Sequence, residues 1–220
     1  LTTAEGVAQL REEIDDADVI YHLAAAVGVF NIIKEPIKTI ETNIGLTKDV
    51  LKFAKLKNKI VVIASTSEAY GKSNKFPFNE DDDLVLGSTK HARWSYAASK
   101  IVDEFLGLAY HQKYGLPVII TRFFNTVGPR QVGEYGMVVP RFIKWALNNE
   151  DIKVYGDGDQ SRCFCNVRDV VRALIEIPNH KECFGKVFNI GSQQEITIED
   201  LAKKTIELTG SSSKIVKIPY

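Results

Sequence analysis

Residues 59–65 read Lys-Ile-Val-Val-Ile-Ala-Ser, a run that is apolar and β-branched almost throughout. Such a run is typical of a strand that is covered on both faces in a parallel sheet. Similar strands are expected at residues 18–25 and 116–124, and long helical segments at 37–55 and 96–114 separate the three. Strands that alternate with long helices predict right-handed crossovers, and therefore an α/β fold with a doubly wound parallel sheet.

The pattern changes after Asn125, where the chain becomes rich in loops and its helices and strands become shorter. Thr197 is a suitable N-cap for the last of these helices, with Asp200 three residues further on. We therefore expect two domains. Residues 1–125 form part of the doubly wound sheet, and residues 126–220 form mainly a smaller α/β substrate-binding subdomain that returns segments to the sheet.

Charge and cysteine content exclude several classes of protein. Lys+Arg and Asp+Glu balance at 28 each, so no net field attracts nucleic acid or an anionic membrane. No apolar run approaches the length of a membrane span, and the first residues do not resemble a signal peptide. Three cysteines without disulfide or zinc spacing fit a reducing compartment. We expect a cytoplasmic protein with no metal and with no nucleic-acid or membrane partner.

Polar or small residues follow three of the predicted strands. These are His22-Leu-Ala-Ala25, Ser65-Thr-Ser-Glu68 and the segment that begins at Asn125. Ligands of a doubly wound sheet bind at the carboxyl ends of its strands. The helix that contains Tyr96 and Lys100 begins just after the second strand and its loop, so we expect all four groups to converge at one edge.

Tyr96 and Lys100 are four residues apart, so their side chains share one face of the predicted helix. An ammonium beside a phenol favours the phenolate, which is a usable general base. The Thr66 hydroxyl could relay or share the proton. This arrangement can remove a proton from an alcohol while a hydride leaves the same carbon. A lysine beside a half-buried tyrosine on an amphipathic helix explains the pair equally well by itself, and the predicted convergence favours the site.

Several motifs occur together in a fixed order. They are His22-Leu-Ala-Ala25, Asn43, Ser65-Thr-Ser-Glu-Ala-Tyr-Gly71, Tyr96-Ala-Ala-Ser-Lys100, Arg122-Phe-Phe-Asn-Thr-Val-Gly-Pro129, and Val154-Tyr-Gly-Asp-Gly158 with Arg162. In these motifs and their spacing, essentially the whole chain resembles the extended short-chain dehydrogenase/reductase superfamily, specifically its nucleotide-sugar epimerase/dehydratase branch. The resemblance implies a Rossmann-like NAD-binding domain over residues 1–125, NAD as cofactor, and a UDP-sugar or other nucleotide sugar as substrate.

The resemblance also implies roles for individual residues. Tyr96 would deprotonate the 4-hydroxyl of the sugar, Lys100 would lower the pKa of Tyr96 and hold the nicotinamide ribose, and Thr66 would hydrogen-bond the same hydroxyl, with Glu68 beside them. NAD would take the hydride and leave a 4-keto sugar. The implied cofactor-binding residues are His22, Leu23, Ala24, Ala25, Asn43, Ser65, Tyr96 and Lys100. The implied substrate-binding residues are Ser67, Asn125, Val138, Val139, Phe142, Tyr155, Arg162 and Arg168.

One feature of the family is missing from the sequence. No Gly-x-x-Gly-x-x-Gly occurs, although that turn cradles the cofactor pyrophosphate at a helix N-terminus. The only methionine is Met137, so the first residue is not a start codon product. We therefore interpret the chain as a fragment whose first strand–helix units are missing, and we expect it to bind NAD poorly or not at all by itself.

The reaction that follows the first oxidation has several candidates. We expect a UDP-sugar 4-epimerase, with a UDP-glucuronate decarboxylase as the alternative and Arg168 as the candidate that binds the carboxylate. A 4,6-dehydratase of this superfamily carries Asp-Glu after the threonine, whereas this chain carries Ser67-Glu68. A candidate of another class is a non-catalytic module that binds sugar nucleotides. The family resemblance also implies a homodimer, and the helix after Tyr96 has apolar residues on more than one face.

Overall fold

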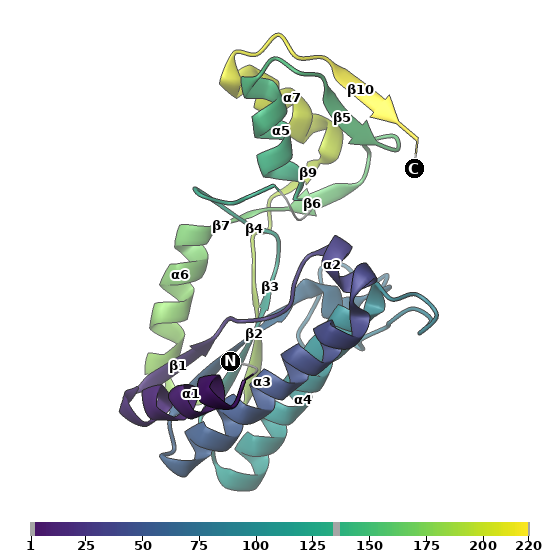
Figure 1. Cartoon of the computed structure of the whole chain (residues 1–220). Helices are drawn as coiled ribbons and strands as arrows, with labels where there is room; N and C mark the ends of the chain where they lie inside the picture. The colour runs from purple at the N-terminus through teal and green to yellow at the C-terminus, as the bar shows by residue number, and fades with distance from the viewer. Residues whose placement is uncertain (1–2, 134–136, 220) are drawn as a thin grey trace. The chain divides into compact units, whose positions relative to one another are not determined.

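The computed structural model describes residues 3–133 and 137–219 (Figure 1). The chain divides into two compact units, which are described separately. The first unit contains Leu1–Phe123 and Val171–Ile190, and the second contains Phe124–Val170 and Gly191–Tyr220. The predicted strands and long helices fall in the first unit, and the loop-rich part of the sequence forms most of the second.

The first unit is built on a four-stranded parallel sheet. Its strands, in spatial order, are β1 (Val19–His22), β2 (Ile60–Thr66), β3 (Val118–Phe123) and β8 (Lys186–Ile190). In the register of the sheet, Val62 of β2 lies between Tyr21 of β1 and Ile119 of β3. The prediction of an α/β fold with a parallel sheet is confirmed, because residues 59–65 form a central strand with neighbours on both sides.

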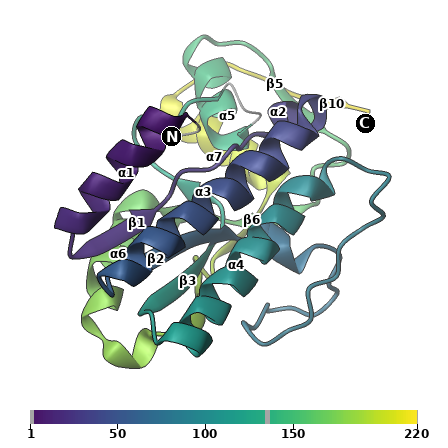
Figure 2. The ribbon, with the colours of Figure 1, turned by 60° about the horizontal axis from the view of Figure 1, so that its bottom comes forward.

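Three helices lie along one face of this sheet (Figure 2). They are α1 (Ala4–Asp16), α3 (Pro36–Leu56) and α4 (Trp94–Tyr114), and a short helix α2 (Val29–Lys34) precedes α3. Pro36 occupies the first turn of α3, where its missing N–H is tolerated. Gly115 ends α4 in the left-handed region at φ +69°, and its N–H donates to the carbonyl of His111. Both long helices lie within two residues of their predicted ranges.

The core of the first unit lies between β2, β3 and the helices. Val61, Ile63, Val118 and Ile120 are fully buried there. Gly107 allows α4 to pack closely on the sheet, since a Cβ at this position would lie 2.9 Å from Ile63 and 3.0 Å from Ile120. Close packing of α4 matters for function, because its first turns carry Tyr96 and Lys100.

A long loop joins β2 to α4 and is tied to the sheet. It begins with the 3-10 helix η1 (Ser67–Tyr70). The Arg122 guanidinium donates to the Tyr70 hydroxyl (2.9 Å) and to the Glu80 carbonyl (3.1 Å). The backbone N–H of Asn189 donates to the Glu80 carboxylate (2.8 Å). These contacts from β3 and β8 fix the segment that separates Thr66 from Tyr96.

The second unit has its own core. Its elements are β4 (Thr126–Val127), α5 (Val138–Leu147), β5 (Ile152–Tyr155), β6 (Ser161–Cys163), β7 (Cys165–Asn166), the start of α6 (Val167–Glu176), β9 (Glu195–Thr197), α7 (Ile198–Thr209) and β10 (Ile215–Ile218). Phe142 and Ala146 of α5 pack with Ile152, Ile198 and Ala202. The predicted N-cap is confirmed, because the Thr197 hydroxyl accepts from the N–H of Asp200 (3.0 Å).

Two 3-10 helices, η2 (Ile177–Asn179) and η3 (Lys181–Cys183), join α6 to β8 in the first unit. None of the helices within residues 3–133 and 137–219 combines the length and the apolar character that crossing a bilayer requires.

Candidate active site

The carboxyl end of β2 and the first turns of α4 meet in the first unit. The helix α4 packs against both β2 and η1. The charges of Glu68, in η1, and of Asp103, in α4, both act on the Tyr96 phenol. The predicted residues Thr66, Glu68, Tyr96 and Lys100 therefore belong to one part of the first unit, at the end of the sheet where ligands of such folds bind.

Thr66 ends β2 and starts η1. Its hydroxyl oxygen accepts from the backbone N–H of Glu68 (3.2 Å), which is the N-cap interaction of η1. The residue is 9% exposed, Ser67 is half-buried and Glu68 is exposed. A hydroxyl that accepts one hydrogen bond retains its own hydrogen, so Thr66 can still donate to a ligand at the strand end.

Tyr96 is a weaker acid in this structure than the sequence predicts. Burial, together with the negative charges of Glu68 and Asp103, raises the pKa of Tyr96 to about 12. We expected a lower pKa because of the neighbouring lysine. That expectation is wrong for the structure, and the position of the lysine gives the reason.

Lys100 is buried and paired with an acidic residue of its own helix. Its side chain is 2% exposed, and its ammonium lies 2.6 Å from Oδ2 of Asp103, whose side chain is fully buried. The positive charge of Lys100 is thus balanced by Asp103. Of this pair it is the Asp103 carboxylate that acts on Tyr96 and raises its pKa, so the pair gives the phenol no acidity.

Asn43 connects the loop after β1 with the start of α4. Its side-chain oxygen accepts from the N–H of Ala26 (2.7 Å), and its side-chain nitrogen donates to Ser99 (3.0 Å). The Ser99 hydroxyl in turn donates to the carbonyl of Tyr96 (2.8 Å). Asn43 is 1% exposed, so in this structure it positions the backbone near the site rather than presenting a free polar group.

His22 and Ser65 are also used internally. His22 is 6% exposed, and its Nε2 is hydrogen-bonded to the Thr47 hydroxyl (2.9 Å). Burial, together with the positive charge of Lys100, lowers the pKa of His22 to about 4, so the ring is neutral at pH 7. The Ser65 hydroxyl donates to the Glu104 carboxylate. Both side chains link the strand ends to the helices, and their contact with a cofactor stays a prediction.

The exposed part of the predicted cofactor set is small and apolar. Leu23 and Ala24 are exposed and Ala25 is half-exposed, so the backbone after β1 is open to a flat ligand. The chain therefore fits the part of an NAD site that lies beside β1 and α4. It contains no glycine-rich turn for the pyrophosphate.

The remaining predicted substrate-binding residues lie in the second unit. Asn125 is exposed, and its side chain donates to the carbonyl of Cys163 (3.1 Å). Tyr155 is 41% exposed, and the Arg141 guanidinium lies 5.9 Å from the centre of its ring. Arg162 and Arg168 are exposed. These side chains are accessible to a ligand within their own unit.

Three of the predicted substrate-binding residues lie in α5 of the second unit and differ in their exposure to solvent. Val138 and Val139 are half-buried in its first turn. Phe142 is 2% exposed and belongs to the core of the unit. The helix turns Phe142 inward while the valines before it remain partly accessible, and the contact of this segment with substrate stays a prediction.

Sequence reasoning missed the acidic residues beside Lys100. Asp103 pairs with Lys100, and Glu104 accepts from Ser65 and from the Arg122 guanidinium (2.7 Å). Both carboxylates are buried, although acidic residues are rarely buried unless they are paired. Their spacing of three and four residues from Lys100 is a signal that could have identified them, since such residues share a helix face.

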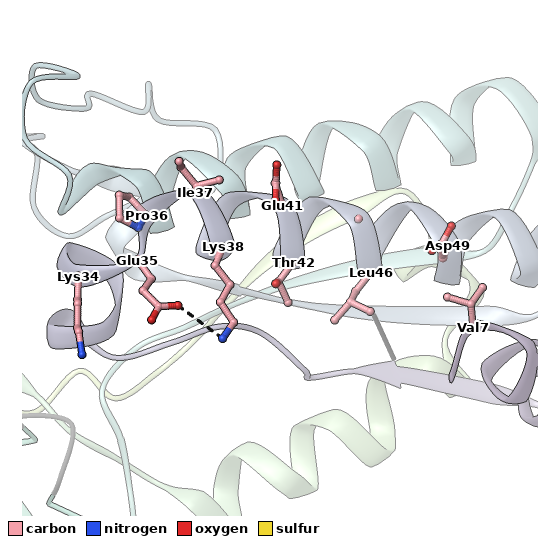
Figure 3. Close-up of a pocket in the computed structure, with 11 residues that line it drawn as sticks. Val7, Lys34, Glu35, Pro36, Ile37, Lys38, Glu41, Thr42, Leu46 and Asp49 are labelled. Atoms are coloured by element: carbon pink, nitrogen blue, oxygen red, sulfur yellow. Dashed lines mark ion pairs between the residues drawn. The ribbon is translucent and has the colours of Figure 1, made fainter. Parts of the chain in front are cut away.

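A pocket of about 710 Å³ opens elsewhere on the first unit, along α3 (Figure 3). Charged residues of both signs line it, including Lys34, Glu41, Asp49 and the ion pair of Lys38 with Glu35 (3.5 Å). None of the predicted site residues lies among those that line it. Its mixed charge gives no preference for an anion or a cation.

Comparison with known proteins agrees with this arrangement. The model of the NAD dependent epimerase/dehydratase family matches residues 1–191. The chain belongs to this family. The resemblance predicted from the sequence motifs is thereby confirmed, as is the link to NAD, since three of the similar solved structures carry NAD.

Within the epimerase/dehydratase family, the similar curated proteins include decarboxylases. The UDP-N-acetyl-alpha-D-glucosaminuronate decarboxylase of Bacillus cytotoxicus is 46% identical over 212 residues, which are 96% of this chain and 65% of that protein. UDP-glucuronic acid decarboxylase 1 of Xenopus tropicalis is 36% identical over 91% of this chain and 47% of its own length. The chain thus spans between about half and two thirds of the length of these relatives.

Similar solved structures of the family include epimerases. The UDP-N-acetylglucosamine 4-epimerase from Methanobrevibacter ruminantium superimposes with a TM-score of 0.90 at 29% identity, over 100% of this chain and 69% of that one. The UDP-glucuronic acid 4-epimerase from Bacillus cereus, solved with UDP-glucuronic acid and NAD, gives a TM-score of 0.84 at 29% identity, over 96% and 65%. The family is clear, and its members differ in the reaction that they catalyse.

Proposed function

We propose that the protein that contains this chain is an NAD-dependent decarboxylase of a UDP-hexuronate. The observation that carries this proposal is the 46% identity to a UDP-N-acetylglucosaminuronate decarboxylase over nearly the whole chain. The chain also holds Thr66, Tyr96 and Lys100 at one end of the sheet of the first unit. Both the acid–base groups and the ancestry therefore fit this reaction.

In the proposed reaction Tyr96 accepts the proton of the sugar 4-hydroxyl, and Thr66 donates a hydrogen bond to the same oxygen. A bound NAD would supply the hydride acceptor for C4. Lys100 would hold the nicotinamide ribose and, once drawn from Asp103, would supply the positive charge that makes the Tyr96 phenolate accessible. The 4-keto product of a uronate is a β-keto acid, and its loss of carbon dioxide needs no protein acid. The enolate that remains would take a proton from solvent at C5, and return of the hydride to C4 and of the Tyr96 proton to its oxygen would give the UDP-pentose.

The identity of the residue after Thr66 argues against a 4,6-dehydratase. Loss of the 6-hydroxyl as water needs an acid beside it, and the resemblance places an aspartate there in dehydratases. This chain has Ser67, whose hydroxyl is a poor acid. A decarboxylase needs no such acid. It needs a cation for the carboxylate, and the exposed Arg168 is the candidate within the second unit.

A second candidate is a UDP-sugar 4-epimerase, which the sequence analysis placed first. The solved epimerases that resemble the chain support it, one of them a UDP-glucuronic acid 4-epimerase. An epimerase shares the first oxidation and returns the hydride to the other face of C4. The curated relatives reverse our order of preference, because several that are 36% to 46% identical to the chain are decarboxylases.

The test is a product assay with the full-length protein. UDP-N-acetylglucosaminuronate, UDP-glucuronate and UDP-glucose are each incubated with NAD, and sugar products and released carbon dioxide are measured. We expect carbon dioxide and a UDP-pentose from a uronate. Epimerised products without carbon dioxide would replace the decarboxylase by the epimerase. Binding without any turnover would favour the non-catalytic module.

The Tyr96→Phe variant is the matched control for this assay. It removes one oxygen from a half-buried ring, so the fold and the binding of the sugar nucleotide should be nearly unchanged. We expect turnover of every substrate to be lost, since each reaction begins at the 4-hydroxyl. Turnover that survives in Tyr96→Phe shows that another group is the base.

The surface of α2, α3 and α4 supports the expectation of a homodimer. Large apolar side chains are exposed on these helices, among them Ile33, Ile37, Ile40, Val102 and Phe105. Ile37 is 71% exposed and Phe105 is 70% exposed. Apolar groups in this number favour burial against a second copy. Analytical ultracentrifugation of the full-length protein measures this, and cell fractionation tests the cytoplasmic location.

A further inference from the structure

The ion pair between Lys100 and Asp103 has an unusual direction. Side chains of a helix lean toward its N-terminus, which for Lys100 is the direction of Tyr96. Its ammonium instead reaches a carboxylate three residues toward the C-terminus, at 2.6 Å. The lysine side chain is long enough to serve either partner, and this structure records it with Asp103.

Asp103 is held in surroundings that favour this contact. It is 0% exposed, and its Oδ1 makes no hydrogen bond of normal geometry among the residues that the structure describes, although the nearby Thr47 hydroxyl acts on the carboxylate as a donor. Its Oδ2 accepts a hydrogen bond from the Lys100 ammonium. A buried carboxylate that lacks a full set of donors holds a nearby ammonium strongly, because separation leaves both charges without water.

We propose that Asp103 is a positioning residue that keeps the Lys100 ammonium from Tyr96, and that a ligand with ribose hydroxyls must draw the ammonium away before Tyr96 acts as a base. This inference rests on the proposed function, in which Tyr96 is the base and the cofactor ribose meets Lys100. Without a cofactor the Lys100 ammonium stays paired with Asp103, and the Tyr96 hydroxyl keeps its proton. The site is thereby inactive as a base until its cofactor is present.

The effect of nearby charges on the pKa of Tyr96 agrees with a Lys100 ammonium that is paired with Asp103. Glu68 of η1 and Asp103 of α4 both raise the pKa of the phenol, in addition to burial. Around Lys100 and Asp103 lie His22 of β1, Thr47 of α3 and Glu104 of α4. His22 is neutral at pH 7, so the group whose charge decides the position of the lysine is Asp103.

The experiment measures the ionisation of Tyr96 in the full-length protein by NMR, with tyrosines labelled at Cζ. Tyr96→Phe identifies its signal among those of the 8 tyrosines. In Asp103→Asn the lysine loses its partner and its charge acts on the phenol. Loss of the Asp103 charge lowers the pKa of Tyr96 by itself. We therefore expect a fall of about 1 unit or more that exceeds the fall in Asp103→Asn combined with Lys100→Met, which has no ammonium. Equal falls in the single and the double variant overturn the proposal.

A second variant keeps the test decisive if Asp103→Asn does not fold. Asp103→Asn combined with Lys100→Met removes both buried charges and leaves side chains of similar size. Because the ammonium of the parent lies at Asp103, the double variant should show only the fall in the pKa of Tyr96 that loss of the Asp103 charge causes. A rise would show that Lys100 already acts on Tyr96, and it would overturn the proposal. Glu41→Gln, on the exposed side of α3, is the charge-removal control and should change nothing.

The last part of the experiment is the titration of Tyr96 in the presence of NAD. When NAD is added to the unchanged protein, we expect the pKa of Tyr96 to fall in the same direction as in Asp103→Asn. If bound NAD leaves it unchanged, the ligand does not draw the lysine away and the proposal fails. None of these titrations needs turnover, so a wrong substrate assignment in the proposed function would leave their outcome intact.

Discussion

His22 makes the stability of the first unit depend on pH in a direction that can be calculated. Its ring is buried against Thr47, and its pKa is lowered to about 4 from the ordinary value of 6.5. Between these two pH values the unfolded chain binds more protons than the folded one. The free energy of unfolding therefore falls as the pH falls through this window.

The size of the effect follows from the two pKa values. The difference between 6.5 and about 4 gives a loss of about 2 kcal/mol at pH 5 and about 3 kcal/mol at pH 4, relative to pH 8. This is a large fraction of the stability of a typical domain. In His22→Gln this part of the pH dependence should vanish, because the amide can still bond Thr47 and does not titrate.

The assay is urea unfolding at a series of pH values, followed by tryptophan fluorescence. Trp94 lies in the first unit and Trp145 in the second. A Trp145→Phe background therefore lets Trp94 report the first unit alone. His180→Gln is the matched control, since His180 is exposed and its pKa is raised by a hydrogen bond to Glu176. His180→Gln should lose the same free energy of unfolding at acid pH as the parent protein.

The reasoning is refuted if His22→Gln and the parent lose the same stability between pH 8 and pH 5. It is equally refuted if NMR shows the His22 ring taking up its proton near pH 6.5 in the folded protein. Either result would mean that the ring is solvated, and that its contact with Thr47 does not hold it neutral.

Two further substitutions test the frame of the site with the same fluorescence assay. Glu104→Gln leaves the Arg122 guanidinium buried without its carboxylate, so we expect a loss of about 3–5 kcal/mol, whereas Lys38→Met at an exposed pair should change little. A small loss in Glu104→Gln would mean that water already reaches the pair. Gly71→Ala adds a Cβ at φ +61° against the carbonyl of Val85, and we expect a loss of about 2–4 kcal/mol. Gly115→Ala has a similar φ, +69°, in open space, and should lose about 1 kcal/mol. Equal losses at the two glycines would contradict the close approach of Val85.

The sequence was a good guide to the elements of the first unit. The run at residues 59–65 is apolar on both faces because β2 is a central strand whose two faces are covered. This apolar pattern does not depend on which side chains pack against it. Local signals also placed the ends of helices, as at Gly115 and Thr197. The motifs around Thr66 and Tyr96 identified the family, because they lie at positions where the fold presents residues to a ligand.

The sequence was a poor guide to which polar groups remain free. His22, Asn43 and Ser65 were predicted to contact the cofactor, yet each is buried in hydrogen bonds to residues between 17 and 56 positions away. Phe142 was predicted in a binding segment and lies in a core. A motif gives the type and order of residues, whereas burial depends on contacts between distant elements.

The partner of Lys100 separates what the sequence determined from what the tertiary structure decided. The sequence determined that a tyrosine, a lysine and two acidic residues follow one another along α4 at helical spacing. At that spacing the lysine can serve Tyr96 or Asp103. In the folded protein the Lys100 ammonium pairs with Asp103. Packing of α4 against the sheet and α3 removes water from this carboxylate, and a buried charge requires an opposite charge beside it.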